Sequence, residues 1–275
     1  MTQLSQGQLP NSRSGKSAMD VAVDAARISG RILQERFRTS MQVSFKGPTD
    51  IVTDVDLAAE RAVLELLRKE YPSFGILAEE SPPVESDSPY TWVVDPLDGT
   101  RNYANGIPHF CTVVALARGD EPVLGVTYDP VREEMFTAQE GQGAFVNGVR
   151  LSVSEGRDLG MALLCCDLGY VDEKAGVALD MIRSLWPGLL GLRLLGSAAL
   201  GVAYAAAGRV DLYFHHSLSP WDIAAGLVLV REAGGVVMDK QGRSASLRTP
   251  SVIASSSFLV DRFLQATDGH PWRDL

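Results

Sequence analysis

The chain has 275 residues, of which 45% are hydrophobic, and this is enough to bury a full core as one large domain or two tightly packed lobes. Its formal net charge of −9 at pH 7 disfavours a nucleic-acid partner, because the phosphates of the backbone would be repelled overall. No hydrophobic run approaches the ~18 residues that a membrane span needs, so no membrane is expected either.

The N-terminus and the cysteines indicate the compartment. Residues 1–17 are polar and lack the apolar segment of a signal peptide, which predicts a disordered tail and no secretion. The three cysteines, two of them adjacent at Cys165 and Cys166, form neither a disulfide framework nor a redox motif. We therefore expect reduced, buried thiols in a cytoplasmic protein.

The first half of the chain predicts helices followed by a sheet. Apolar residues at helical spacing predict amphipathic helices over residues 17–37 and 56–70. Short β-type runs separated by turn dipeptides predict a meander of antiparallel strands over residues 110–118, 123–128 and 134–138.

The second half alternates strands and helices, which is typical of an α/β lobe. The predicted strands are 161–166, 192–195 and 210–214. The predicted helices between and after them are 172–186, 197–207 and 221–233. Pro220 stands just before the last helix, so the carboxylate of Asp222 should project from a helix N-terminus. We divide the chain into the tail 1–17, an N-terminal lobe 18–155 with the antiparallel sheet and a C-terminal α/β lobe 156–275.

Two carboxylates stand three residues apart where an apolar strand breaks in the segment 92–103. Pro96 lacks the N–H that a ladder needs, so the strand is predicted to end near Asp95. The backbone carbonyl of Leu97 lies between Asp95 and Asp98 in the sequence. These oxygens suit a hard divalent cation such as Mg²⁺.

The residues that follow offer groups for an anion. If a helix begins there, the amides of Gly99 and Thr100 face an incoming phosphate. In the alternative interpretation, Asp-Pro and Asp-Gly are ordinary turn dipeptides and Asp98 is a helix N-cap. Spacing alone leaves both interpretations open.

The segment Asp-Pro-Leu-Asp-Gly-Thr after Trp-Val-Val resembles the signature of the inositol monophosphatase family. Three further segments resemble family elements in the expected order: KGPTDIVTDVD at 46–56, ILAEES at 76–81 and SPWDIAAG at 219–226. The resemblance implies an α+β fold, namely the layered α-β-α-β-α sandwich of the sugar phosphatase type. Its two lobes would pack tightly, with the active site in the cleft between them.

The resemblance also implies the activity. Members hydrolyse a small soluble phosphomonoester with water activated by two or three Mg²⁺ ions, release inorganic phosphate and are lithium-sensitive. Relatives are commonly homodimers, and we expect one here. The metal ligands of the family carry over onto Glu79, Asp95, the carbonyl of Leu97, Asp98 and Asp222.

The catalytic roles carry over in the same way. Asp56 and Thr100 resemble the water-activating pair of the family, and Glu79 joins them as a catalytic residue. Phosphate is expected at Asp98, Gly99 and Thr100. Without the resemblance, the favoured interpretation is that Asp56 is a helix N-cap and that the Thr100 hydroxyl bonds to the backbone.

Substrate choice is less determined. The segment Gly196-Ser197-Ala198 matches a family element that contacts a polyol or sugar, together with Asp222. In relatives that act on inositol phosphates, a glutamate six residues before the Trp-Asp pair contacts ring hydroxyls, whereas this chain has His215 there. His215 either serves a different leaving group or simply ends a strand.

Two classes of function are therefore considered. The first is a phosphatase for an inositol phosphate or, alternatively, for fructose 1,6-bisphosphate, histidinol phosphate, a nucleotide 3′-phosphate or NADP. The second is a non-catalytic regulatory protein that retains the fold, which the complete ligand set disfavours. Lys174, Arg183 and Arg193 are candidates for binding a second phosphate.

Overall fold

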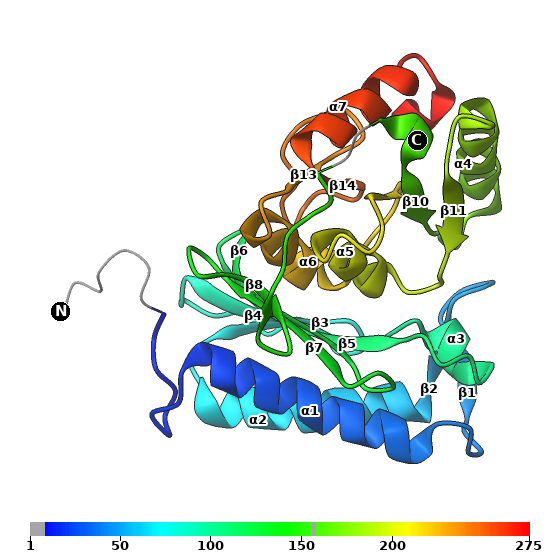
Figure 1. Ribbon diagram of the computed structural model, residues 1–275. Coiled ribbons are helices and arrows are strands. Elements are labelled where there is room, and N and C mark those ends of the chain that lie inside the picture. The colour runs from blue at the N-terminus through cyan, green and yellow to red at the C-terminus, as the bar shows by residue number, and fades with distance from the viewer. Residues whose placement is uncertain (1–8, 156–157) are drawn as a thin grey trace.

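The computed structural model describes residues 9–155 and 158–275, which form the five layers of an α-β-α-β-α sandwich (Figure 1). Two helices cover the outer face of a seven-stranded sheet, two lie between this sheet and a five-stranded sheet, and two cover the far side. The outer helices are α1 (Ala18–Arg36) and α2 (Asp54–Glu70), and the middle helices are α5 (Ala198–Ala206) and α6 (Pro220–Glu232). The helices on the far side are α4 (Asp172–Leu185) and α7 (Ser257–Ala266). The predicted layered fold is confirmed.

The seven-stranded sheet is largely the predicted meander. Its strands pair antiparallel in chain order, except that the first two are parallel. They are β3 (Gly75–Ala78), β4 (Tyr90–Asp98), β5 (Cys111–Arg118), β6 (Glu121–Asp129), β7 (Glu134–Gln139), β8 (Gly143–Val146) and β9 (Val149–Arg150).

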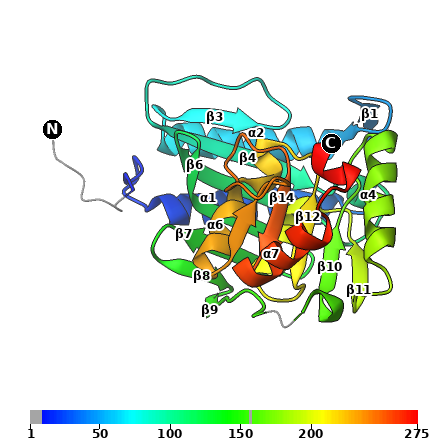
Figure 2. The same ribbon diagram turned by 90° about the horizontal axis from the view of Figure 1, so that it is seen from above.

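The five-stranded sheet has the spatial order β11-β10-β12-β14-β13, and Figure 2 shows β11, β10, β12 and β14 side by side. Its strands are β10 (Leu163–Cys166), β11 (Gly191–Leu194), β12 (Leu212–His215), β13 (Val236–Met238) and β14 (Val252–Ser255). Because β10, β11 and β12 are parallel, their carboxyl ends share one edge of the sheet. Functional side chains are expected at such an edge in α/β sheets.

Strand β4 does not end at Asp95, so that prediction is wrong. It continues to Asp98, and its pairing with β5 shifts register: Asp95 lies opposite Val113 and Asp98 opposite Cys111. The extra residue on β4 forms a bulge, which is where a strand tolerates proline. The carbonyl oxygen of Pro96 accepts hydrogen bonds from the hydroxyls of Ser29 and Thr112, each at 2.9 Å.

Helix α2 begins two residues before its predicted start at Asp56. Thr53 is the N-cap, and its hydroxyl accepts hydrogen bonds from the amides of Val55 and Asp56. Asp56 is the third helical residue and completes a capping box, since its carboxylate accepts the Thr53 amide at 3.0 Å. The interpretation of Asp56 as an N-cap is therefore wrong.

Several short elements carried no clear signal in the sequence. They include the hairpin of β1 (Val43–Phe45) and β2 (Ile51–Thr53), whose first strand is exposed throughout, and the one-turn helix α3 (Thr100–Ala104). The predicted strand from residue 161 begins at Leu163, because Leu159–Met161 form a 3₁₀ turn. A second 3₁₀ turn, Pro271–Asp274, lies near the end of the chain.

Residues 1–8 of the predicted tail 1–17 lie outside the described part of the chain. Beyond them, the amide of Arg13 donates to the Glu70 carbonyl at 2.9 Å, and the Ser14 hydroxyl donates to the Glu70 carboxylate at 2.6 Å. These contacts tie the segment to the end of α2. Among the helices of the described residues, none combines the length and apolarity that a membrane crossing requires.

The middle layer is buried on both sides. Helix α6 packs against β4, β5, β6 and β7 of the larger sheet and against α5 beside it. Gly125 on β6 permits this close approach, because a Cβ there would lie 2.6 Å from the Cα of Ala225 and 2.8 Å from its carbonyl oxygen. Neither backbone atom is free to move away.

We predict that Gly125→Ala lowers the free energy of unfolding by about 2 to 3 kcal/mol through this overpacking. The control is Gly176→Ala on α4, where an added Cβ meets nothing within 4 Å. Helix propensity should make the control more stable by about 0.5 to 1 kcal/mol. Urea unfolding measures both, and a Gly125→Ala protein as stable as the wild type contradicts the described packing.

Candidate metal centre and active site

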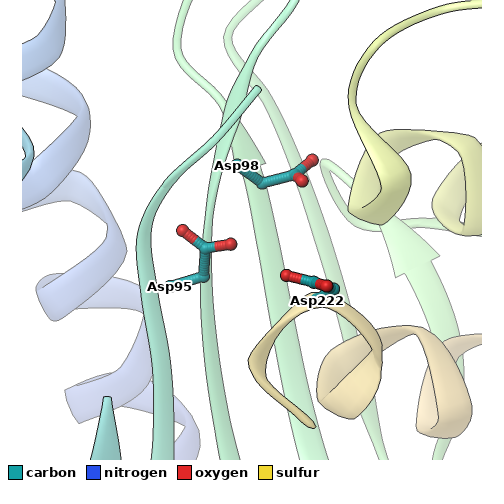
Figure 3. A group of neighbouring side chains, drawn as sticks. All are labelled: Asp95, Asp98 and Asp222. Atoms are coloured by element: carbon teal, nitrogen blue, oxygen red, sulfur yellow. The ribbon is translucent and has the colours of Figure 1, made fainter. Parts of the chain in front are cut away.

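Three carboxylates from two segments meet between the lobes (Figure 3). Asp95 and Asp98 come from the end of β4, and Asp222 comes from the first turn of α6. One oxygen of each lies within 4.8 Å of the others. Only 1% of Asp95 and 8% of Asp98 is exposed, so water screens their charges poorly.

This arrangement disfavours the charged forms of all three groups. Burial raises the pKa of Asp95, Asp98 and Asp222 above the ordinary value. The charges of Asp98 and Asp222 raise the pKa of Asp95 further, as does that of Glu79. A divalent cation would relieve this repulsion, and a donor set made only of oxygens fits Mg²⁺. The predicted carboxylate cluster is thus present and has the chemistry of a metal site.

Asp98 is held by donors from the start of α5 and from β5. Its Oδ2 accepts the Ser197 hydroxyl, the Ala199 amide at 3.1 Å and the Cys111 thiol at 3.6 Å. Ser197, which we expected to contact substrate, is therefore engaged with a site carboxylate. It fixes the direction of Asp98 and joins the start of α5 to the end of β4.

Asp95 and Asp222 are oriented by their own turns. Oδ1 of Asp95 accepts the Leu97 amide at 2.9 Å within the bulge of β4. Oδ2 of Asp222 accepts the Ser219 amide at 2.8 Å, which forms a capping box at the start of α6. Asp95 also shares a side-chain hydrogen bond with Glu79.

Glu79, which follows β3, lies outside the group of three close carboxylates. Its Oε1 accepts the Lys46 ammonium at 2.6 Å, and Lys46 also donates to Glu80 at 2.8 Å. Burial raises the pKa of Glu79 to about 7, although the Lys46 charge opposes this shift. The charge of Glu79 still acts on Asp95, so the two carboxylates are neighbours.

The predicted pair of Asp56 and Thr100 is in contact. The Thr100 hydroxyl lies 3.0 Å from Oδ1 of Asp56 and 3.0 Å from the Leu97 carbonyl oxygen. The other Asp56 oxygen accepts both the hydroxyl and the amide of Thr53. Burial raises the pKa of Asp56. The structure therefore links α2, β4 and the start of α3 at one hydroxyl group.

Gly99 is the N-cap of α3 and has a left-handed backbone with φ of 93°. A Cβ at this position would lie 3.2 Å from the carbonyl oxygens of Gly196 and His109. Glycine is thus required by both the φ value and the close approach of backbone. Thr100 begins α3, as the phosphate-binding interpretation of these two residues requires.

The segment Gly196-Ser197-Ala198 leads into α5, which begins at Ala198. Its backbone is held by two residues that we had not singled out. Oδ1 of Asp167 accepts a hydrogen bond from the Gly196 amide at 2.6 Å, and Nδ2 of Asn102 donates to the Gly196 carbonyl at 3.2 Å. Asp167 directly follows a predicted strand, a position that could have identified it.

Arg101 and Tyr170 join the two lobes beside the site, and neither was singled out in the sequence. The Arg101 guanidinium lies 4.3 Å from the centre of the Tyr170 ring, and its Nε donates to the Thr49 carbonyl at 3.0 Å. The Thr49 hydroxyl donates to the Tyr170 carbonyl at 3.2 Å. These residues are far apart in sequence, so only the fold reveals the contact.

His215 ends β12 and is not part of the carboxylate group. Only 2% of the residue is exposed, and Nδ1 accepts the Ser217 amide at 3.0 Å. Its ring stacks on that of His216 with 5.0 Å between centroids. Burial and the neighbouring imidazole lower the pKa of His215 to about 3, so the ring is neutral at pH 7.

Comparisons with known proteins agree with this site. A model of the inositol monophosphatase family matches residues 16–271. An inositol-1-monophosphatase of Mesorhizobium japonicum is 42% identical over 252 residues, which cover 90% of this chain and 95% of that protein. Nus factor SuhB of Escherichia coli is 40% identical over 250 residues, 90% of this chain and 94% of that protein.

A solved structure shares the fold at similar identity. The extragenic suppressor protein suhB of Bartonella henselae matches with a TM-score of 0.88 and 39% identity, covering 91% of this chain and 98% of that chain. The fold and the buried group of carboxylates, which could hold a metal ion, are those of an inositol monophosphatase family phosphatase. This chain belongs to the inositol monophosphatase family.

We predict that Mg²⁺ competes with protons at the carboxylates. Because the pKa of Glu79 is about 7, its proton must leave before a cation can bind there. Affinity for Mg²⁺ should rise about tenfold between pH 6 and pH 8 as this proton is lost. Calorimetry measures the affinity, and Glu79→Gln should flatten the dependence. Affinity that falls with rising pH contradicts the prediction.

Proposed function

We propose that the protein hydrolyses a small phosphomonoester with Mg²⁺-activated water and releases inorganic phosphate. The observation that carries the proposal is the buried group of Asp95, Asp98 and Asp222, whose pKa values are raised by burial. The name of the relative from Mesorhizobium japonicum supports an inositol 1-phosphate as substrate. The other family substrates named in the sequence analysis remain alternatives.

Five groups would hold the metal: Glu79, Asp95, the Leu97 carbonyl, Asp98 and Asp222. When bound, two or three Mg²⁺ ions would supply charge neutralisation on the phosphoryl oxygens and a water of lowered pKa. The Lys46 ammonium, which donates to Glu79, would have to move away before a metal ion could bind at that carboxylate. This competition suggests that the hairpin of β1 and β2 shifts as the site is filled.

Thr100 and Asp56 would orient the attacking water. When the Thr100 hydroxyl donates a hydrogen bond to Asp56, its oxygen can still accept a hydrogen bond from the attacking water. The amides of Gly99 and Thr100 would donate to the phosphate, with Asp98 beside them. Glu79 is proposed to act with this pair.

The remainder of the substrate would lie near Gly196, Ser197 and Ala198, with Asp222 and His215 beside it. Among these, the Ser197 hydroxyl already donates to Asp98, so substrate contact there would fall to backbone groups. A neutral His215 with Nδ1 occupied offers a donor at Nε2, where a glutamate would offer an acceptor. This difference favours a substrate other than a simple inositol phosphate.

A homodimer remains a prediction from the family, and a cytoplasmic location remains a prediction from the cysteines and the polar N-terminus. The absence of a nucleic-acid partner also remains a prediction, because relatives named Nus factor SuhB resemble this chain as closely as the phosphatase relative does. A non-catalytic role is the second candidate, and the same assay decides between them.

The deciding experiment is phosphate release from inositol 1-phosphate, fructose 1,6-bisphosphate, histidinol phosphate, adenosine 3′,5′-bisphosphate and NADP. Each is tested with Mg²⁺ and with EDTA. Release that requires Mg²⁺ supports the phosphatase, whereas no release from any compound favours the non-catalytic protein.

We predict that Asp95→Asn lowers kcat/KM by about a hundredfold or more, because it removes a charged ligand shared by the cluster. The protein should remain folded, since Asn still accepts the Leu97 amide and one buried charge is lost. Circular dichroism checks the fold. Near-normal turnover would refute the metal assignment.

Thr100→Ala should lower kcat about a hundredfold if the hydroxyl orients water. The matched control, Thr100→Ser, keeps the hydroxyl and should retain most of the activity. Titration of activity with Mg²⁺ should give a similar half-saturating concentration in all three proteins. A comparable loss of Mg²⁺ affinity in Thr100→Ala would show that the residue supports the metal instead.

A further inference from the structure

The turn that leads into α5 is held from two sides. It comprises Leu195, Gly196 and Ser197, between the end of β11 and the start of α5. On one side, Oδ1 of Asp167 accepts hydrogen bonds from the Leu195 amide at 3.1 Å and the Gly196 amide at 2.6 Å. On the other side, Nδ2 of Asn102 on α3 donates to the Leu195 carbonyl at 2.8 Å and the Gly196 carbonyl at 3.2 Å. The backbone amides and carbonyls of both turn residues are therefore bonded to side chains of other elements.

The parallel pairing of the strands places Asp167 beside this turn. Cys166, the last residue of β10, lies opposite Leu194, the last residue of β11. Asp167 therefore leaves the sheet at the same level as Leu195, where its carboxylate reaches the backbone amides of the neighbouring chain segment. Its other oxygen, Oδ2, accepts a hydrogen bond from the hydroxyl of Tyr213 on β12 at 3.3 Å. Asp167 thus bonds to groups on both sides of β10.

The residues that follow in the chain contact Asp98. Ser197 is the next residue after Gly196, and its hydroxyl donates to Oδ2 of Asp98. The Ala199 amide donates to the same oxygen at 3.1 Å. Only 1% of Ser197 and 8% of Asp98 is exposed, so water cannot readily replace these donors. Asp167 and Asp98 are therefore linked through one buried turn.

The direction of the Asp98 carboxylate depends mainly on this turn. The remaining side-chain donor to its Oδ2 is the Cys111 thiol at 3.6 Å, and a thiol is a weak donor. A carboxylate that binds a metal ion must hold a fixed direction, and the groups that hydrogen-bond to such a ligand commonly change metal affinity 10- to 100-fold when they are lost, by order of magnitude. A change in the place of Ser197 and Ala199 should therefore be felt at the metal centre.

We propose that Asp167 is a positioning residue, which directs Asp98 toward the metal ion by fixing the turn 195–197. The inference rests on the proposed function, because it takes Asp98 as a metal ligand. Asp167 itself lies outside the group of three close carboxylates, and its Oδ1 is bonded to two amides. Its contribution is therefore the place of an acceptor oxygen, and its negative charge is not required.

Calorimetric titration with Mg²⁺ tests this inference without reference to turnover. Asp167→Ala should weaken Mg²⁺ binding about tenfold, because the turn loses the acceptor of two amides. Asp167→Asn keeps an acceptor oxygen without the charge and should bind Mg²⁺ nearly as tightly as the wild type. Wild-type affinity in Asp167→Ala overturns the proposal. An equal loss in both variants also overturns it, since the charge of Asp167 would then be what matters.

Two further variants separate positioning from a general loss of stability. Tyr213→Phe removes the hydroxyl that donates to Oδ2 of Asp167 but leaves both amides on Oδ1, so its Mg²⁺ affinity should equal that of the wild type. A loss as large as that in Asp167→Ala would overturn the proposal. In a double-mutant cycle, Asp167→Ala and Ser197→Ala should together lose less binding free energy than the sum of their separate losses, because both act on Asp98. Losses that add in full contradict a route through the turn.

Urea unfolding checks that each variant is folded, and Asp167→Ser, whose hydroxyl is one bond shorter, replaces Asp167→Ala if the latter does not fold. If the wild type binds no Mg²⁺, the proposed function fails, and amide hydrogen exchange in EDTA decides the inference. The Ala199 amide should then exchange about tenfold faster in Asp167→Ala than in the wild type or in Asp167→Asn. This difference supports the hold of Asp167 on Asp98 without the proposed function, and equal exchange in all three proteins overturns both.

Discussion

The middle layer, α5 and α6, is the constraint on which the site depends. Both helices are buried between two sheets, so neither can shift without opening the largest hydrophobic cluster of the described residues. Glycine at position 125 lets α6 lie directly on the larger sheet. This contact brings the first turn of α6, with Asp222, against the end of β4. The start of α5 meets Asp98 in the same way, through the Ser197 hydroxyl and the Ala199 amide.

The fold uses this rigidity to hold like charges together. Buried carboxylates within a few ångströms of one another are unfavourable in the absence of a cation, and folding energy from the surrounding core must offset that cost. A backbone amide orients each carboxylate: that of Leu97 donates to Asp95, that of Ala199 to Asp98 and that of Ser219 to Asp222. Such fixed orientation is what an oxygen-coordinated metal requires, because the ligands need not reorganise when it binds.

Helices α2 and α6 both begin with a capping box. In both, a hydroxyl residue is the N-cap and an aspartate three residues later accepts the N-cap amide, at 3.0 Å for Asp56 and 2.8 Å for Asp222. The two aspartates differ only in what the tertiary structure sets beside them. Asp56 meets the Thr100 hydroxyl, whereas Asp222 meets two further carboxylates. One local pattern thus yields a candidate water-orienting group and a candidate metal ligand.

The sequence by itself determined the layered fold, the family and the carboxylates at the end of β4, because hydrophobic periodicity and a run of specific motifs are local properties. It misplaced the end of β4, since the bulge that accommodates Pro96 depends on pairing with β5. Only the tertiary structure decided that Ser197 supports Asp98 and that the Arg101 guanidinium lies over the Tyr170 ring. These facts depend on residues far apart in the chain, and no local pattern records which distant side chains will share one buried space.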